Sequence, residues 1–346
     1  MKRKFMPRAE EVEDAAYKNF RSWVALNRVV VEHSEGEAVW KYYDYGPREC
    51  PPLICLCGTS GTAESFYKQI VGLSSRGYRV ISVQAPPYMS HYSWVKGFDR
   101  FLVRIGLNNT KVHLFGTTLG GFQALYFAQC RPQRVASIIL CNAIINLNHF
   151  AAKAPCLGMF GLAPEFLLKR MLLSNFPRGK MEASIAQSVD FMVAQVDDFS
   201  HADLVSRLTL TCSPTNFAPY DLPIPQSAIT IITSLDPVSV PYSLLQQVID
   251  TYPKAKIAYL KTGGNFPFLC RADEVNMYIQ VHMRKQGIGV VPSENTSTGE
   301  MDEEHKHNAN DKESEEEEEE TEEDTKRANE EEVNGNKTKG KEKVDH

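Results

Sequence analysis

The chain has 346 residues, of which 42% are hydrophobic and 10% aromatic, so it can fill the core of one large α/β domain or of two ordinary ones. Its charge is uneven: residues 293–346 hold 21 acidic and eight basic residues, a net charge of −13, whereas residues 1–292 hold 22 acidic and 30 basic residues, a net charge of +8. The basic residues are dispersed and form no stripe with aromatic residues, which argues against nucleic-acid binding.

Both ends of the chain are predicted to lie outside the folded domain. Residues 1–24 are interpreted as an N-terminal extension, because the basic start MKRKF is not followed by the apolar stretch of a secretory signal. Residues 290–346 include six consecutive glutamates at 315–320 and almost no apolar residues. Such a segment buries too little surface to offset the entropy of ordering, so it is predicted to be a disordered acidic tail.

The composition also bears on the compartment of the protein. No window approaches the roughly 20 apolar residues of a membrane-spanning helix. The eight cysteines contain no C-x-x-C pair, which favours reduced thiols over disulfide bonds or metal ligands, and no cofactor is predicted. A cytoplasmic protein of the cytosol is the simplest interpretation.

Short β-branched runs alternate with helical patterns over residues 25–289, which predicts an α/β fold with a mostly parallel central sheet and helices on both faces. The predicted strands are, in chain order, 28–33, 38–46, 53–58, 78–88, 111–116, 135–143, 228–236 and 256–264. The first two are expected to form an antiparallel hairpin. The helices predicted to follow individual strands include 63–76, 94–105, 119–130 and 272–285.

The stretch 144–222 interrupts this alternation. It holds apolar residues at three- and four-residue spacing and no strand pattern, which predicts helices. We interpret it as an all-helical lid inserted after the strand that follows the 119–130 helix.

Three loops at the carboxyl ends of predicted strands are candidates for chemistry, because ligands bind there in α/β sheets. The segment HLFGTTLGGF (113–122) resembles the G-x-S-x-G elbow that carries a serine nucleophile, but Thr118 occupies the serine position. The loops after the last two strands hold Asp236 and Asn265. The chain order nucleophile, acid, base is that of the α/β-hydrolase fold, so these three residues are the candidate triad positions.

The residue types at these positions argue against catalysis. A hydrolytic triad needs a base that takes the proton of the nucleophile, and the carboxamide of Asn265 has no basic site near neutral pH. The elbow nucleophile usually has a positive φ, which the β-branched Thr118 disfavours. We therefore interpret Thr118, Asp236 and Asn265 as vestigial triad positions, with Asp236 and Asn265 bracing their loops.

The segment CGTSGT (57–62), here called the oxyanion loop, occupies the place where active hydrolases bind the developing oxyanion. Active relatives often have His-Gly where this chain has Cys57 and Gly58. The backbone N–H groups of Gly58, Thr59 and Leu119 remain candidates for binding an anion or a carbonyl oxygen. A plain turn is the alternative interpretation.

The segments HLFGTTLGGF, RLTLTC, LKTGGNFPFLCR and EVNMYIQVH resemble the maspardin family of the α/β-hydrolase superfamily. The resemblance covers most of the body and excludes the acidic tail. It implies a protein of the cytosol, or peripheral to endosomal or trans-Golgi membranes, that acts by binding other proteins. The family keeps serine at the elbow and has asparagine in the GGNFP loop, so this chain departs further from an active hydrolase.

Three functions follow as hypotheses. The first is an inactive protein that binds protein partners through the lid helices or the segments 85–94 and 265–269, although the latter equally fits a buried core. The second is a small-molecule receptor with Thr118 and Asn265 at the floor of an apolar cavity. The third is an esterase with a threonine nucleophile and a displaced base.

The third hypothesis requires a histidine nitrogen within about 3 Å of the Thr118 hydroxyl. His91, His149 and His201 lie in predicted loop or lid regions and are the candidates. His113 and His282 are expected to be structural, because one opens a buried strand at its amino end and the other lies within the last helix.

Overall fold

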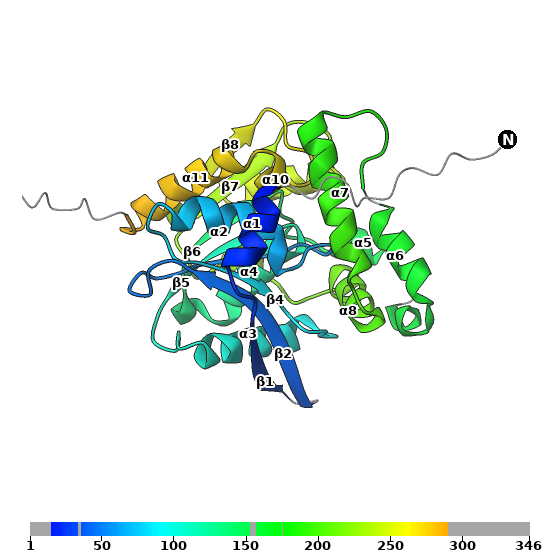
Figure 1. The fold of residues 1–346 in the computed structure, drawn as a ribbon. Coiled ribbons are helices and arrows are strands. Elements are labelled where there is room, and N and C mark those ends of the chain that lie inside the picture. The colour runs from blue at the N-terminus through cyan, green and yellow to red at the C-terminus, as the bar shows by residue number, and fades with distance from the viewer. Residues whose placement is uncertain (1–14, 34–35, 153–156, 175, 290–346) are drawn as a thin grey trace, which may run out of the picture. The chain divides into compact units, whose positions relative to one another are not determined.

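A computed structural model describes residues 15–33, 36–152, 157–174 and 176–289 (Figure 1). Eight strands form one sheet in the order β1-β2-β4-β3-β5-β6-β7-β8. The strands are β1 (Asn27–His33), β2 (Gly36–Tyr45), β3 (Leu53–Leu56), β4 (Val80–Gln84), β5 (Val112–Thr117), β6 (Val135–Cys141), β7 (Ile229–Ser234) and β8 (Lys256–Leu260). β2 pairs antiparallel with β1 and β4, and every other pairing is parallel, which confirms the predicted hairpin and the mostly parallel sheet.

Helices cover both faces of the sheet. The helices around the sheet are α1 (Ala15–Trp23), α2 (Tyr67–Ser74), α3 (His91–Arg104), α4 (Leu119–Cys130), α9 (Tyr242–Thr251), α10 (Pro267–Cys270) and α11 (Ala272–Lys285). Side chains of α3, α4 and α9 bury one face, and side chains of α1, α2 and α11 bury the other. This is the three-layer arrangement that alternating strands and helices predict.

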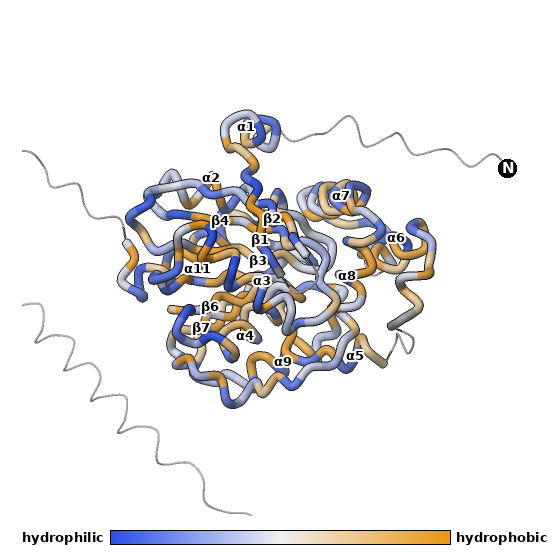
Figure 2. The backbone as a smooth tube through the Cα atoms, turned by 90° about the horizontal axis from the view of Figure 1, so that it is seen from below, coloured by the Kyte–Doolittle hydropathy of each residue, from blue (hydrophilic) through white to orange (hydrophobic). Residues whose placement is uncertain are grey.

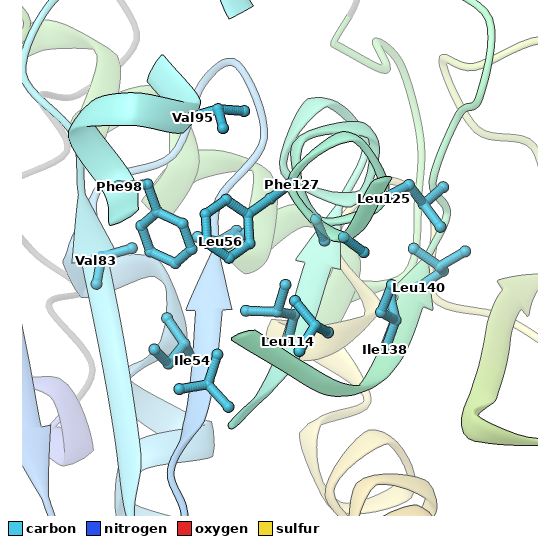
Figure 3. Packing of buried hydrophobic residues seen from close by; sticks show 14 of the residues in the cluster. Ile54, Leu56, Val83, Val95, Phe98, Leu114, Leu125, Phe127, Ile138 and Leu140 are labelled. Atoms are coloured by element: carbon cyan, nitrogen blue, oxygen red, sulfur yellow. The ribbon is translucent and has the colours of Figure 1, made fainter. Parts of the chain in front are cut away.

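The alternation of side chains along each strand supplies both cores. In β3, Ile54 and Leu56 point to the face covered by α3 and α4, whereas Leu53 and Cys55 belong to the cluster on the opposite face. Figure 3 shows the first of these faces, where strand side chains meet aromatic rings of α3 and α4 such as Phe98. Because all four β3 side chains are buried, the strand reads in the sequence as a continuous apolar run.

The lid interval contains helices α5 (Asn148–Ala151), α6 (Glu165–Leu173), α7 (Ala183–Asp197) and α8 (His201–Cys212), with a 3₁₀-helix η4 (Leu157–Leu162) before α6. All of them lie between β6 and β7, where the sequence predicts an all-helical insertion. They share a core of their own, formed by the buried side chains Phe160, Leu168, Leu172, Val196, Phe199, Leu204, Val205, Leu208 and Cys212. The chain between β6 and β7 therefore packs as a unit of helices next to the sheet (Figure 1).

Helix α1 differs from the prediction, because it lies in the range 1–24 that was interpreted as an extension. Its Tyr17 and Phe20 are buried against α2, and the phenols of Tyr17 and Tyr43 both donate hydrogen bonds to Glu64. The i, i+3, i+7 spacing of Tyr17, Phe20 and Val24 gives the helix an apolar stripe that the domain covers. Residues 15–24 therefore pack as part of the folded body. The remainder of the predicted extension and the predicted acidic tail lie outside the described residues.

Two predicted boundaries are also wrong for local reasons. The strand predicted over 78–88 ends at Gln84, because Pro86 and Pro87 have no N–H to donate to a neighbouring strand. The next helix starts at His91 and not at residue 94, since the Ser90 side chain accepts a hydrogen bond from the Ser93 N–H and caps the helix.

Candidate functional site

The predicted elbow joins β5 to α4 through Thr118, which has φ 45° and ψ −112°. The positive φ agrees with the expectation for an elbow residue, and for a β-branched residue it stores strain. The crossing depends on glycine. A Cβ added to Gly120 would lie 2.1 Å from the Leu56 carbonyl oxygen, and one added to Gly116 would lie 2.5 Å from the Gly120 carbonyl oxygen. The backbone of an elbow is therefore complete, whatever residue stands at its centre.

The Thr118 hydroxyl lies directly over the oxyanion loop. A Cβ added to Gly58 would come within 2.1 Å of Thr118 Oγ1, so the two residues are in close contact. Among the described residues the Thr118 hydroxyl has no hydrogen-bond partner. No imidazole or carboxylate of this part of the chain is hydrogen-bonded to it.

The base position is occupied by an amide that bonds elsewhere. Asn265 Oδ1 accepts a hydrogen bond from the Ser239 N–H at 2.6 Å, and Asn265 Nδ2 donates to Ser239 Oγ at 2.5 Å. Both atoms of the carboxamide therefore hold the loop after β7. Asn265 ties the loop after β8 to the loop after β7 instead of orienting a nucleophile.

The acid position has a similar bracing contact. The Asp236 carboxylate accepts hydrogen bonds from the N–H groups of Gly263 and Gly264, each at 3.0 Å. A carboxylate in an active triad would orient the imidazole of the base instead. Here the carboxylate instead accepts hydrogen bonds from two backbone N–H groups of the neighbouring loop.

A third loop joins this network through Asn142, which the sequence analysis missed. Asn142 follows β6 with φ 44°, accepts a hydrogen bond from the Ser234 N–H at 3.1 Å and donates to the Gly264 carbonyl oxygen at 3.0 Å. Asparagine tolerates a positive φ better than most residues, so an asparagine directly after a buried strand was the available signal. Ser239, also missed, had no such signal.

The oxyanion loop is held by side chains from two directions. The Gly58 N–H donates to Thr117 Oγ1 at 3.1 Å, so this predicted oxyanion donor is already engaged. Arg207 of α8 donates to the carbonyl oxygens of Gly58 and Thr59 at 3.2 and 3.1 Å. Of the other two predicted donors, Thr59 and Leu119, the Leu119 N–H lies at the first position of α4, where a helix provides no acceptor.

Beneath the lid lies a cavity of about 130 Å³ that brings several predicted site residues together. Thr118 and Asn265 both line it, with Thr59 and Leu119 of the oxyanion positions, whereas Asp236 does not. The other lining residues are Ser60, Asn142, Ile144, Phe150, Leu172, Phe176, Leu208, Thr211, Val238, Ser239, Val240 and Phe266. The walls are mostly apolar and carry no charged side chain.

The histidines that were candidates for a displaced base bond to other groups or to none. His91 Nε2 pairs with the Leu210 carbonyl oxygen at 2.8 Å, and burial lowers the pKa of His91 to about 4. His201 Nε2 pairs with the Ala163 carbonyl oxygen at 2.9 Å. The Nε2 atom of His149 is buried without a partner in the described part of the chain. None of the three lines the cavity.

The other two buried histidines lie at the opposite end of the sheet, as expected for structural residues. His113 Nδ1 and His282 Nε2 each lie 2.7 Å from the hydroxyl of Ser137, and His282 Nδ1 lies 2.8 Å from Thr230 Oγ1. Burial lowers the pKa of His113 to about 4 and, with the nearby charge of His113, lowers that of His282 to about 3. Both rings are therefore neutral at physiological pH.

The described residues contain neither a cluster of metal-ligating side chains nor a membrane-spanning helix. No group of three or more His, Cys, Asp and Glu side chains there is placed to hold a metal ion. None of the helices in these residues is both long and apolar enough to cross a membrane.

An elbow between β5 and α4, acid and base positions after β7 and β8, and helices inserted after β6 define an α/β-hydrolase-fold protein. The chain belongs to the alpha/beta hydrolase family, which its residues 53–277 match, and is a homologue of the maspardins. It is 40% identical to maspardin of Danio rerio over 272 residues, which cover 78% of this chain and 86% of that protein. It is 39% identical to maspardin of Homo sapiens over 273 residues, covering 77% and 86%.

Solved structures agree on the fold. A hydrolase from Pseudomonas aeruginosa superposes with a TM-score of 0.61 at 15% identity, covering 74% of this chain and 98% of that one. A thermophilic esterase from Thermogutta terrifontis gives a TM-score of 0.58 at 18% identity, covering 76% and 100%. At these identities the likeness concerns the fold alone.

Proposed function

We propose that this protein is catalytically silent and acts by binding protein partners. The observation that carries the proposal is the pairing of Asn265 with Ser239, which leaves the Thr118 hydroxyl without a proton acceptor. A carboxamide is not a general base near neutral pH, and loss of one triad member leaves only the roughly 10³- to 10⁴-fold residual effect of binding and the oxyanion hole.

The hydrogen bonds of Asn142, Asp236 and Asn265 support the same proposal, because they give these three residues a structural role. Each of these side chains uses its polar atoms to join two loops at the carboxyl end of the sheet. A site kept for turnover needs groups free to exchange protons. A site kept as architecture needs only hydrogen bonds that hold the loops in place.

The binding surface is proposed on the lid helices and on the segment 85–94. In that segment Met89 and Tyr92 are exposed. The other candidate segment, 265–269, is withdrawn as a surface because Phe266, Phe268 and Leu269 are buried. Resemblance to the maspardin family supports a location in the cytosol or at the surface of endosomal or trans-Golgi membranes.

The test is an assay of the purified protein against short- and medium-chain esters, with intact-mass measurement after a fluorophosphonate probe. We expect no turnover beyond that of Thr118→Ala and no adduct. The double variant Thr118→Ser with Asn265→His places a serine at the nucleophile position and a histidine at the base position. It tests whether the protein can gain esterase activity. Wild-type turnover or an adduct on Thr118 would contradict the proposal.

Such turnover would favour the esterase hypothesis, for which His149 is the available base. Its Nε2 atom is buried and unpaired among the described residues, and its ring lies against Phe150, which lines the cavity. His149→Ala should then abolish the activity, whereas His201→Ala, which removes a ring bonded to a carbonyl, should not.

A small-molecule receptor is the second candidate function, and the cavity favours it. Its volume of about 130 Å³ is close to that of an engineered apolar cavity that admits benzene, at roughly 150 Å³. Hydroxyls and amides at the floor and apolar walls suit an uncharged compound with one carbonyl group. Native mass spectrometry with small ketones and esters tests this function. Val240→Phe, which fills the cavity, should abolish uptake, and Val281→Phe on the exposed face of α11 should not.

A further inference from the structure

The outer side of the lid exposes a cluster of large apolar side chains. Leu162 is 87% exposed, Phe166 72% and Met159 61%. Leu167 and Met171 of the same segment are also exposed. We call these five residues the lid patch. Large exposed apolar patches often mark a contact with another body in soluble proteins.

The patch exists because α6 is apolar on both sides and the fold covers only one of them. Leu168 and Leu172 point inward and pack in the core of the lid. Phe166 lies on the other side of the helix and is largely exposed, whereas Leu167 and Met171 are partly exposed. An apolar side of a helix normally packs against another body, and within the described residues nothing covers Phe166 on α6.

Hydrogen bonds hold the patch in this orientation. The Ala163 carbonyl oxygen, between η4 and α6, pairs with His201 Nε2 at 2.9 Å. Lys169 donates to the Asp197 carbonyl oxygen at 2.9 Å and forms an ion pair with Glu165 at 2.9 Å. The segment is thus tied to both α7 and α8. Figures 1 and 2 place α6 at the edge of the molecule, on the side away from the sheet.

The segment that carries the patch has a positive net charge, although Asp197 of α7 lies beside α6. Residues 148–181 hold five Lys and Arg residues and one Glu. Arg170, Arg178 and Lys180 are exposed and form no ion pair within the described part of the chain. Exposed apolar residues on a helix flanked by unpaired cations are typical of segments that lie in the interface of an anionic membrane.

We propose that the lid patch docks the protein on an anionic lipid surface, with Leu162, Phe166 and Met159 entering the headgroup region and the flanking cations contacting acidic headgroups. The high exposed fractions favour a membrane over a protein groove, because side chains that line a groove shield one another, whereas these protrude. This function goes beyond the proposed binding of protein partners and does not depend on the state of the triad.

The test is co-sedimentation of the full-length protein with vesicles of phosphatidylcholine alone and of phosphatidylcholine mixed with phosphatidylserine. We expect binding to the mixed vesicles that weakens with salt. Phe166→Asp and Leu162→Asp should each weaken it by about tenfold or more, since each removes one inserted apolar side chain. Arg170→Glu should weaken it several-fold through lost headgroup attraction.

Met277→Asp is the matched control, because it places the same charge on an exposed apolar site of a helix on the body. Thermal melts and light scattering on each variant verify folding and oligomeric state. Three outcomes overturn the proposal: no binding of the wild type to either vesicle, equal loss in Met277→Asp, or an effect of the patch variants on self-association alone. The last would assign the patch to a second copy of this chain.

Discussion

The two ends of the parallel sheet hold polar side chains of different kinds. At the amino end, His113 and His282 share the hydroxyl of Ser137, inside the core. At the carboxyl end, where an α/β-hydrolase does its chemistry, Asn265 and Asp236 occupy the base and acid positions and brace loops. No histidine of the described residues lines the cavity there. Two imidazoles of the chain thus act as packing groups at the amino end of the sheet, and none of the described histidines lines the cavity beneath the lid.

The two ends build hydrogen-bond networks from different groups, imidazoles at one end and amides with a carboxylate at the other. Burial lowers the pKa of both amino-end histidines below physiological pH, so they act as neutral hydrogen-bonding groups. The carboxyl end reaches a similar result with amides and one carboxylate. The carboxyl end differs in that its cavity lies beneath the lid, above Thr118, and has mostly apolar walls.

The largest effect is expected from lowering the pH, which acts on the two buried histidines at the amino end of the sheet. The folded pKa values of His113 and His282, about 4 and about 3, lie below the unfolded value of about 6.5. The unfolded chain therefore binds more protons as the pH falls, and the stability that these neutral rings contribute is full above pH 6.5 and is lost below it. From pH 7 to pH 5 we expect a loss of roughly 2 kcal/mol for each histidine, about 4 kcal/mol together.

Urea unfolding at the two pH values measures this loss. His282→Gln, which keeps a neutral polar side chain, should reduce the pH dependence. Equal unfolding midpoints of the wild type at pH 7 and pH 5 would mean that His113 and His282 are not held as buried, neutral rings at the amino end of the sheet.

A smaller but still large effect is expected at the elbow. Gly120→Ala places a Cβ 2.1 Å from the Leu56 carbonyl oxygen, and the backbone must move to accept it. We expect a loss of about 3 kcal/mol in the free energy of unfolding. Gly161→Ala is the control, because an added Cβ there has no neighbour within 4 Å. If both variants unfold alike, the crossing of β5 and α4 is not as tight as the structure has it.

Substitution of Asp236, at the acid position, tests whether this carboxylate has a structural or a catalytic role. Asp236→Ala removes the acceptor of two backbone N–H groups and should cost about 2 kcal/mol, whereas Asp236→Asn, which keeps one acceptor oxygen, should cost about half of that. Chemical denaturation measures both. A catalytic carboxylate held without a structural role would give the opposite result, with Asp236→Ala neutral or stabilising.

The smallest effect tests the strain at the elbow. Thr118→Gly replaces a β-branched residue that is strained at a positive φ with glycine, which adopts this φ without strain. The substitution should raise the free energy of unfolding by about 1 kcal/mol. Thr118→Ala, which keeps a Cβ, should gain less. Differential scanning calorimetry resolves a change of this size as a shift of a few degrees. Destabilisation by Thr118→Gly would indicate a contact of the side chain that outweighs the strain.

Much of the fold was predictable because its signals are local. The helices 119–130 and 272–285 were predicted with the bounds that α4 and α11 have. Helix α1 was missed because its nine residues are short and its apolar stripe has meaning only against α2. The burial of segment 265–269 stayed open for the same reason, since an aromatic-proline run fits a surface or a core equally well.

The features of the site were likewise predictable only where their signal in the sequence is local. The positive φ of Thr118 followed from the motif, and the lack of a basic group followed from the identity of Asn265. The partners of Asn142 lie 92 and 122 residues further along the chain, at Ser234 and Gly264. Contacts at that separation leave no spacing in the sequence from which to predict them.

The sequence by itself determined the order of strands and helices, the elbow and the absence of an imidazole at the base position, because each depends on residue identity or local periodicity. Tertiary structure alone decided that both atoms of the Asn265 amide face Ser239, that the lid leaves a cavity over Thr118, and that the described residues leave Phe166 of α6 exposed. The physical reason is that hydrogen bonds and burial between distant segments arise only when the sheet brings its strand ends together.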